Sequence, residues 1–191
     1  SGEIPRENYL LIRDIDRMAE KLEYLKNKGV TVLFSPLSDG GKVGYWWSGS
    51  AEGYLWLWRS MVTRLNEYHG LNNIIWVWNG GSADYYPGDE YVDIVGENVY
   101  NITGDRGNGR FMGTAFYGTS RAVALNECAM VPGADVLEQD NAHWLWFALG
   151  SGDKLIDENG RLTEKYSSNV ILEQVYNHKN FLTLDEIPKF E

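Results

Sequence analysis

Hydrophobic residues recur at helical spacing in several stretches of the chain. Over residues 7–28 and 51–69 they fall three or four positions apart, which predicts a helix with one buried face in each stretch. Gly29 follows Lys28, a cation-then-glycine order typical of a helix end. Weaker patterns predict a helix over 110–118 and a last one over 163–176. The residues on the first two faces are Ile12, Ile15, Met18, Ala19, Leu22 and Leu25, then Tyr54, Leu57, Trp58, Met61, Leu65 and Tyr68.

Short, almost wholly apolar runs alternate with these helices. They predict strands over 29–34, 73–78, 91–96, 121–125 and 143–147. In the last of these, Trp144 and Trp146 alternate and are expected on one face. Strands buried on both faces read as continuous apolar runs, as several of these do, so we expect parallel strands joined by helical crossovers.

Two α/β architectures fit this alternation: an open doubly wound sheet and a (β/α)8 barrel. No GxGxxG or Walker glycine pattern follows any predicted strand, which disfavours a nucleotide-binding sheet. In a barrel, the chemistry sits at the carboxyl ends of the strands.

Composition narrows the class of ligand. The 191 residues predict a single domain over 1–191. The net charge of −10 argues against nucleic acid or an anionic membrane as partner, and no apolar run is long enough to span a membrane. The 8 Trp, 12 Tyr and 6 Phe supply flat faces that stack on sugar rings, although any one Trp could equally belong to the core.

No motif in the sequence indicates a cofactor or a metal ion. Cys128 is the single cysteine, so no internal disulfide forms, and we interpret it as a small buried residue rather than a nucleophile. His69, His143 and His178 lack metal-ligand spacing, and HExxH, CxxC and GxSxG patterns are absent. We therefore expect no cofactor and no metal.

Carboxylates, amides and a tyrosine follow the predicted strands. They are Asp39 after the first strand, Asn79 after the second, Glu97, Asn98 and Tyr100 after the third, and Asn126 and Glu127 after the fourth. Paired carboxylates flanked by aromatic residues are typical of the active sites that hydrolyse glycosidic bonds. Any one of these acids, taken alone, is more often a helix cap or a loop charge, so the prediction rests on the joint pattern.

The same motifs resemble those of glycoside hydrolase family 26, the β-mannanase family of retaining (β/α)8 enzymes. The resemblance covers about residues 10–190. It is carried by residues 32–39, 45–47, 57–59, 69–79, 86–96, 123–127, 144–147 and 175–188 together, from Ser35-Pro36-Leu37-Ser38-Asp39 to Asn126-Glu127.

The resemblance implies roles for particular residues. Glu127 matches the nucleophile at the end of barrel strand seven, and Asp39 falls at the acid/base position after strand four. Tyr100 matches a tyrosine near the nucleophile, and Trp144 matches a tryptophan that lines the sugar-binding cleft. We also expect Trp47, Trp78 and Asn79 to bind substrate.

This chain departs from the family pattern around Asp39. The family usually reads Arg-Pro-Leu-His-Glu where residues 35–39 read Ser-Pro-Leu-Ser-Asp, so the carboxyl is one methylene shorter. A tryptophan of the family appears as Gly44, and an aspartate as Asn98.

Matched against the family, the chain begins at the helix before strand four. The expectation is therefore a partial (β/α)8 barrel covering strands four to eight, with two open strand edges that a second copy or another chain supplying the missing strands covers. The alternatives are that the arc closes in a different way, or that an upstream segment is missing from this sequence. The implied activity is that of a secreted retaining endo-β-mannanase acting on β-1,4-mannan or a related β-linked plant polysaccharide, although Ser1-Gly2-Glu3 shows no signal peptide. The alternative is an inactive homologue that binds glycan or serves in protein assembly.

Overall fold

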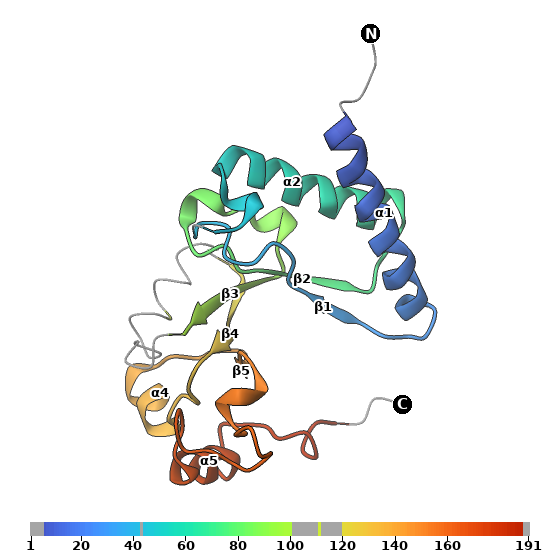
Figure 1. Cartoon of the computed structure of the whole chain (residues 1–191). Helices are drawn as coiled ribbons and strands as arrows, with labels where there is room; N and C mark the ends of the chain where they lie inside the picture. The colour runs from blue at the N-terminus through green and yellow to red at the C-terminus, as the bar shows by residue number, and fades with distance from the viewer. Residues whose placement is uncertain (1–5, 43, 101–110, 112–119, 189–191) are drawn as a thin grey trace. The chain divides into compact units, whose positions relative to one another are not determined.

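The computed structural model describes residues 6–42, 44–100, 111 and 120–188 (Figure 1). These residues form two compact units, the first ending at Val95 and the second running from Gly96, with Ser120 and Arg121 returning to the first. The helices are α1 (Arg6–Lys26), α2 (Ala51–Thr63), α4 (Ala134–Asp140) and α5 (Asn169–Tyr176). The strands are β1 (Val32–Phe34), β2 (Ile74–Trp78), β3 (Ile94–Val99), β4 (Ala122–Cys128) and β5 (Phe147–Leu149).

The five strands follow one another in the sheet in chain order, β1-β2-β3-β4-β5. The pairs β1–β2, β2–β3 and β4–β5 are parallel, with Val32 opposite Ile74, Val77 opposite Ile94 and Leu125 opposite Phe147. Sequential parallel strands are the arrangement that the sequence predicts. Helix α2 lies between β1 and β2 and α4 between β4 and β5, whereas only 3-10 turns are found between β2 and β3.

In the first unit, α1 and α2 lie on the same side of β1 and β2 (Figure 1). Ile15, Ala19 and Leu22 form the buried face of α1. From α2, the fully buried Trp58 meets Trp76 of β2 edge-on, with ring centroids 5.9 Å apart. The helical pattern of the sequence therefore identifies the core of this unit correctly.

The predicted helix over 51–69 is continuous but changes its winding. Ser50 caps α2 by accepting a hydrogen bond from Gly53 N, and a π-helical turn, Arg64–Tyr68, follows directly on Thr63. That turn brings Arg64 to α1, where its guanidinium donates two hydrogen bonds to the Asp16 carboxylate. The two helices are thus joined by an ion pair as well as by their apolar faces.

The second unit has two small apolar clusters. Val99, Leu125 and Cys128 pack with Trp144, Phe147 and Leu149. Val131, Ala134 of α4 and Val175 of α5 form the other cluster. Cys128 is fully buried, as expected of a small apolar residue, and its thiol donates to the carbonyl oxygen of Ala148.

Several element bounds differ from the sequence prediction. β3 begins at Ile94 rather than residue 91, because residues 89–91 form a 3-10 turn, and it continues to Val99. Glu97 and Asn98 therefore lie inside the strand and are buried, instead of following it. β5 covers residues 147–149 rather than 143–147, so Trp144 and Trp146 precede it. The predicted helix over 110–118 lies outside the described residues, apart from Phe111.

The C-terminal helix is shorter than its apolar pattern suggests. α5 starts at Asn169 rather than residue 163, because the Ser168 hydroxyl caps it by accepting from Ile171 N. The short helix α4 was not predicted, since seven residues carry too little periodicity to be recognised.

Candidate active site

Each strand of the first unit delivers a predicted site residue at its carboxyl end. Asp39 lies in the loop that follows β1, five residues beyond Phe34. Asn79 follows Trp78, the last residue of β2. In parallel sheets of this class, this end of the strands carries the chemistry.

The loop that carries Asp39 is bound to the loop that follows β2. The backbone N–H of Asp39 donates to the carbonyl oxygen of Asn79 at 2.6 Å, and Gly41 N donates to the carbonyl oxygen of Gly80 at 2.6 Å. Leu37 and Asp39 both adopt the left-handed conformation, with φ of 52° and 58°. Aspartate tolerates that conformation better than most residues, so the chain can turn sharply at this carboxylate.

Two glycines permit this close approach. A Cβ added to Gly40 would lie 2.5 Å from Cε2 of the buried Tyr54, and one added to Gly41 would lie 2.6 Å from Cβ of Ser82. Asp39-Gly40-Gly41 is thus a packing requirement as well as a turn signal. No local sequence pattern reveals this contact, because Tyr54 and Ser82 are distant from the two glycines in the sequence.

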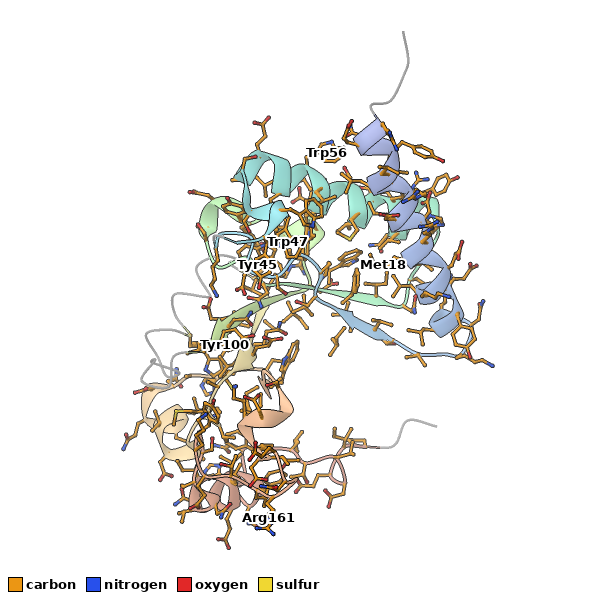
Figure 2. All side chains as sticks on the ribbon, in the orientation of Figure 1. Met18, Tyr45, Trp47, Trp56, Tyr100 and Arg161 are labelled. Carbon is orange, nitrogen blue, oxygen red and sulfur yellow. The ribbon has the colours of Figure 1, made fainter. Side chains whose placement is uncertain are left out.

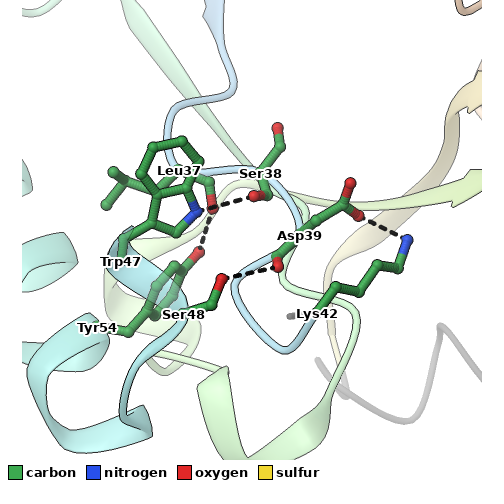
Figure 3. A network of polar contacts seen from close by, with 7 residues as sticks. All are labelled: Leu37, Ser38, Asp39, Lys42, Trp47, Ser48 and Tyr54. Carbon is green, nitrogen blue, oxygen red and sulfur yellow. Dashed lines mark hydrogen bonds and ion pairs between the residues drawn. The ribbon is translucent and has the colours of Figure 1, made fainter. Parts of the chain in front are cut away.

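Three side chains hold three consecutive carbonyl groups of this loop (Figure 3). The Tyr54 hydroxyl donates to Leu37 O at 3.1 Å, Trp47 Nε1 to Ser38 O at 3.0 Å, and Ser48 Oγ to Asp39 O at 3.5 Å. Burial raises the pKa of Tyr54 above its usual range, with the nearby Asp39 charge adding to the effect, so its hydroxyl stays protonated and remains a donor. The backbone around Asp39 is therefore fixed from α2 and from the segment before it.

The Asp39 carboxylate is paired with a cation. It is 8% exposed, and its Oδ1 lies 2.7 Å from Nζ of Lys42, three residues further on (Figure 3). Lys42 is itself exposed, so the cation of this pair faces solvent while the carboxylate is buried. Sequence reasoning did not find Lys42, because the pair depends on the left-handed turn at Asp39.

Trp78 ends β2, and Asn79 begins the loop that is hydrogen-bonded to the Asp39 loop. Trp78 is fully buried and meets Tyr86 edge-on, with centroids 5.0 Å apart. A ring with no exposed face cannot stack on a sugar in this conformation, so Trp78 fits a supporting role better than the direct contact that the sequence suggested. Asn79 is 1% exposed, and its Nδ2 has no hydrogen-bond acceptor in the part of the chain that the structure describes.

In the second unit, Glu127 is the penultimate residue of β4. This confirms the predicted position at the carboxyl end of a buried strand, since Val123, Ala124 and Leu125 are all buried. The Glu127 side chain is partly exposed.

A β-bulge lies at Glu127. Leu125 pairs with Phe147 and Cys128 pairs with Leu149. The chain therefore advances by three residues along β4 where it advances by two along β5. The additional residue lies at Asn126–Glu127. Bulges redirect side chains and are frequent beside active sites, so the register shift beside Glu127 interrupts the regular alternation of side chains where this carboxylate stands.

Tyr100 and Trp144 lie close to the end of β4. A Cβ on Gly150 would lie 2.8 Å from Cε1 of Tyr100, so the tyrosine ring rests on the backbone of that glycine. Gly150 N in turn donates to the carbonyl oxygen of Cys128, the neighbour of Glu127. Trp144 packs on the cluster that contains Cys128 and meets Phe111 edge-on at 5.3 Å.

The described residues hold no group of three His, Cys, Asp or Glu side chains arranged to bind a metal ion. Within the same ranges, no helix is long and apolar enough to cross a lipid bilayer. At its strand ends the first unit offers the Asp39 carboxylate and the buried Asn79 amide, and the second unit offers the Glu127 carboxylate with Tyr100 and Trp144 near it.

Comparison with known protein families identifies the family of this chain. The sequence profile of glycosyl hydrolase family 26 matches residues 3–186. This chain belongs to glycosyl hydrolase family 26. The resemblance carried by the sequence motifs is therefore confirmed.

Named relatives of this family 26 chain are mannanases. It is 38% identical to a mannan endo-1,4-beta-mannosidase of Thermothelomyces thermophilus over 188 residues, covering 94% of this chain and 37% of the relative. It is 29% identical to mannan endo-1,4-beta-mannosidase B of Piromyces sp, covering 94% of this chain and 30% of the relative. The chain thus spans about a third of the length of these relatives.

Solved structures confirm the fold class. The Podospora anserina GH26-CBM35 β-(1,4)-mannanase superposes with a TM-score of 0.81 at 33% identity, covering 95% of this chain and 40% of that one. A β-mannanase from a symbiotic protist of the termite Reticulitermes speratus, complexed with gluco-manno-oligosaccharide, gives a TM-score of 0.83 at 28% identity, covering 100% of this chain and 58% of that one. The chain has the fold of a partial (β/α)8 barrel.

Proposed function

We propose that this chain is part of a retaining endo-β-1,4-mannanase that cleaves β-1,4-mannan or a related β-linked polysaccharide. Membership of family 26 over residues 3–186 carries the proposal, because the relatives named above are mannan endo-1,4-beta-mannosidases. The position of Glu127 at the carboxyl end of β4 supports it independently.

In this proposal Glu127 is the nucleophile. Its carboxylate attacks the anomeric carbon of the sugar, the bond to the leaving oxygen breaks, and a covalent glycosyl–enzyme ester forms. The β-bulge at Asn126–Glu127 supports this role, since it interrupts the regular alternation of side chains where this carboxylate stands.

Asp39 is proposed as the acid/base. It protonates the leaving oxygen in the first step and, as a carboxylate, takes a proton from the water that hydrolyses the ester in the second. The three anchored carbonyl groups of residues 37–39 support the assignment, because an acid/base acts only when held in place. Lys42, at 2.7 Å, pairs with the carboxylate form of Asp39, which is the form that acts as the base in the second step.

Trp47, Tyr100 and Trp144 are proposed to contact the polysaccharide. All three are at least partly exposed and belong to segments at strand ends. Asn79 supplies a buried amide donor that a sugar hydroxyl or a bridging water can satisfy. We assign Trp78 to the support of the loop above it.

The two-carboxylate reaction requires no cofactor or metal ion. A polysaccharide substrate is too large to enter a cell, so we propose that the enzyme acts outside it. We also propose that the chain associates with a second copy or with a chain that supplies further strands.

Reducing-sugar release from mannan, glucan and xylan tests the proposed activity. We expect mannan to be cleaved, and Glu127→Gln to abolish cleavage without unfolding the chain. Glu173→Gln, at an exposed position of α5, is the matched control and should keep full activity. Equal rates for wild type and Glu127→Gln would overturn the assignment of the nucleophile.

A further inference from the structure

Three consecutive aromatic residues, Tyr45, Trp46 and Trp47, lie between the Asp39 loop and α2. We call them the aromatic platform. The rings of Tyr45 and Trp47 stack at 4.7 Å with planes 7° apart (Figure 2), while Trp46 stands nearly perpendicular to Trp47 at 5.5 Å and 83°. The 3-10 turn Trp46–Ser48 sends the two tryptophans in different directions.

Two residues of the aromatic platform face solvent. Trp46 is 66% exposed and Tyr45 is 48% exposed, whereas Trp58 and Trp78 are fully buried. Packing accounts for Trp47, whose indole N–H binds the Ser38 carbonyl. It leaves most of the Trp46 side chain open to solvent, where a ligand can cover it and gain from burying its apolar surface.

The aromatic platform is also rigid. Ser48 N donates to Tyr45 O at 3.1 Å and closes the turn, and the Tyr85 hydroxyl donates to Ser48 O at 3.1 Å. Trp46 therefore lies between two anchored residues. A surface fixed in this way binds a ligand with little loss of conformational entropy.

We propose that the aromatic platform is a sugar-binding surface and that Trp46 provides its main contact. The ligand is a pyranose ring of the β-linked polysaccharide, and its identity as mannan rests on the proposed function. The apolar C–H face of a pyranose covers an indole ring while its hydroxyl groups stay in water. A neutral ligand also suits a chain of net charge −10.

The aromatic platform is joined to the loop that carries Asp39, which favours a polysaccharide over a protein as the ligand that covers it. Trp47 and Ser48 bind the carbonyl groups of Ser38 and Asp39, so the aromatic platform and the proposed acid/base share one loop framework. A polysaccharide chain cleaved at Asp39 extends over several sugar units and needs contacts beyond the reacting one. The aromatic platform supplies such a contact beside the site of cleavage.

Calorimetric titration of the Glu127→Gln chain with mannohexaose tests the inference through binding alone, because this variant should not cleave the ligand, and the variants below are made in the same background. We expect Trp46→Ala to weaken binding about tenfold, the effect of losing one aromatic stacking contact. Trp56→Ala is the matched control, because Trp56 is 47% exposed but lies on α2 beside the N-terminal part of α1 (Figure 2). Trp46→Phe should restore most of the affinity, and circular dichroism verifies that each variant is folded.

The outcomes separate this inference from the proposed function. Unchanged mannohexaose binding by Trp46→Ala overturns the inference even if mannan is cleaved. Weakened binding by Trp46→Ala supports it even if no cleavage is found, in which case the proposed activity fails alone. If Trp46→Ala instead lowers the mass of the chain in light scattering while binding is unchanged, the aromatic platform is a contact between copies and the inference is overturned.

Discussion

The backbone N–H of Asp39 donates to the carbonyl oxygen of Asn79 at 2.6 Å, which ties the loop after β1 to the loop after β2. The bond forms because Asp39 takes the left-handed conformation and because Gly40 and Gly41 let the two backbones approach. The position of the proposed acid/base is therefore set partly by two glycines, which have no side chain that could take part in the reaction.

Gly40→Ala should disturb this arrangement. Its Cβ would lie 2.5 Å from Cε2 of Tyr54, which is buried and cannot move away. We expect the free energy of unfolding to fall by about 1–3 kcal/mol, as measured by urea denaturation, and mannan cleavage to fall with it. Gly49→Ala is the control, since its Cβ would meet nothing closer than 3.9 Å, and equal losses in both variants would contradict the packing argument.

Asp39→Glu should raise turnover on mannan. Retaining hydrolysis needs carboxyl groups about 5–5.5 Å apart, and a displacement of about 1 Å can cost 100-fold, so the methylene that Asp39 lacks relative to the family glutamate should matter for turnover. Glu127→Asp, which shortens the other carboxylate, should lower turnover. An Asp39→Glu variant with unchanged or lower turnover would show that Asp39 is not a shortened acid/base.

The amphipathic helices were predictable from the sequence because their pattern is long. Residues 7–28 and 51–69 each repeat an apolar face over several turns, and the structure places helices there within about two residues at each end. The run from Trp144 to Phe147 misled the prediction of β5. Asn141 turns into the left-handed conformation at the end of α4, and Trp144 N bonds back to Ala142 O. Leu145 and Trp146 already exchange backbone hydrogen bonds with β4, but the strand itself begins at Phe147.

The candidate site was predictable in its residue types but not in its geometry. The apolar run before Glu127 places that residue at a strand end. The bulge at Glu127 depends on pairing with β5, which no local pattern encodes. The Lys42–Asp39 pair depends likewise on a left-handed turn, and only the sequence Asp39-Gly40-Gly41 hints at it.

The ion pair between α1 and the end of α2 should make stability depend on pH. The Arg64 hydrogen bond, supported by His69, lowers the pKa of Asp16 from 3.8 to about 2. A lowered folded-state pKa stabilises the fold fully above the ordinary value and loses that effect as the pH falls from about 4 toward 2.

Asp16→Asn should therefore lower the free energy of unfolding at pH 7 by at most about 1 kcal/mol, since the pair is partly exposed. The difference from wild type should shrink by pH 2. Urea midpoints at the two pH values measure this, with the exposed Asp14→Asn on the same helix as control. A difference of equal size at both pH values would mean that Asp16 acts by packing rather than by charge.

Association should involve β1, a terminal strand in the order of the described sheet. Leu33 of that strand is 57% exposed and Val30 just before it is 42% exposed, so apolar side chains lie beside backbone groups able to pair with another strand. We expect light scattering at micromolar concentration to give a mass above that of one chain. Leu33→Lys should lower that mass, because a charge on an edge strand opposes pairing, whereas Leu184→Lys, at an 88% exposed position far along the chain, should leave it unchanged. A wild-type chain that keeps the mass of a single copy at every concentration, with no other polypeptide bound, would sink the association proposal.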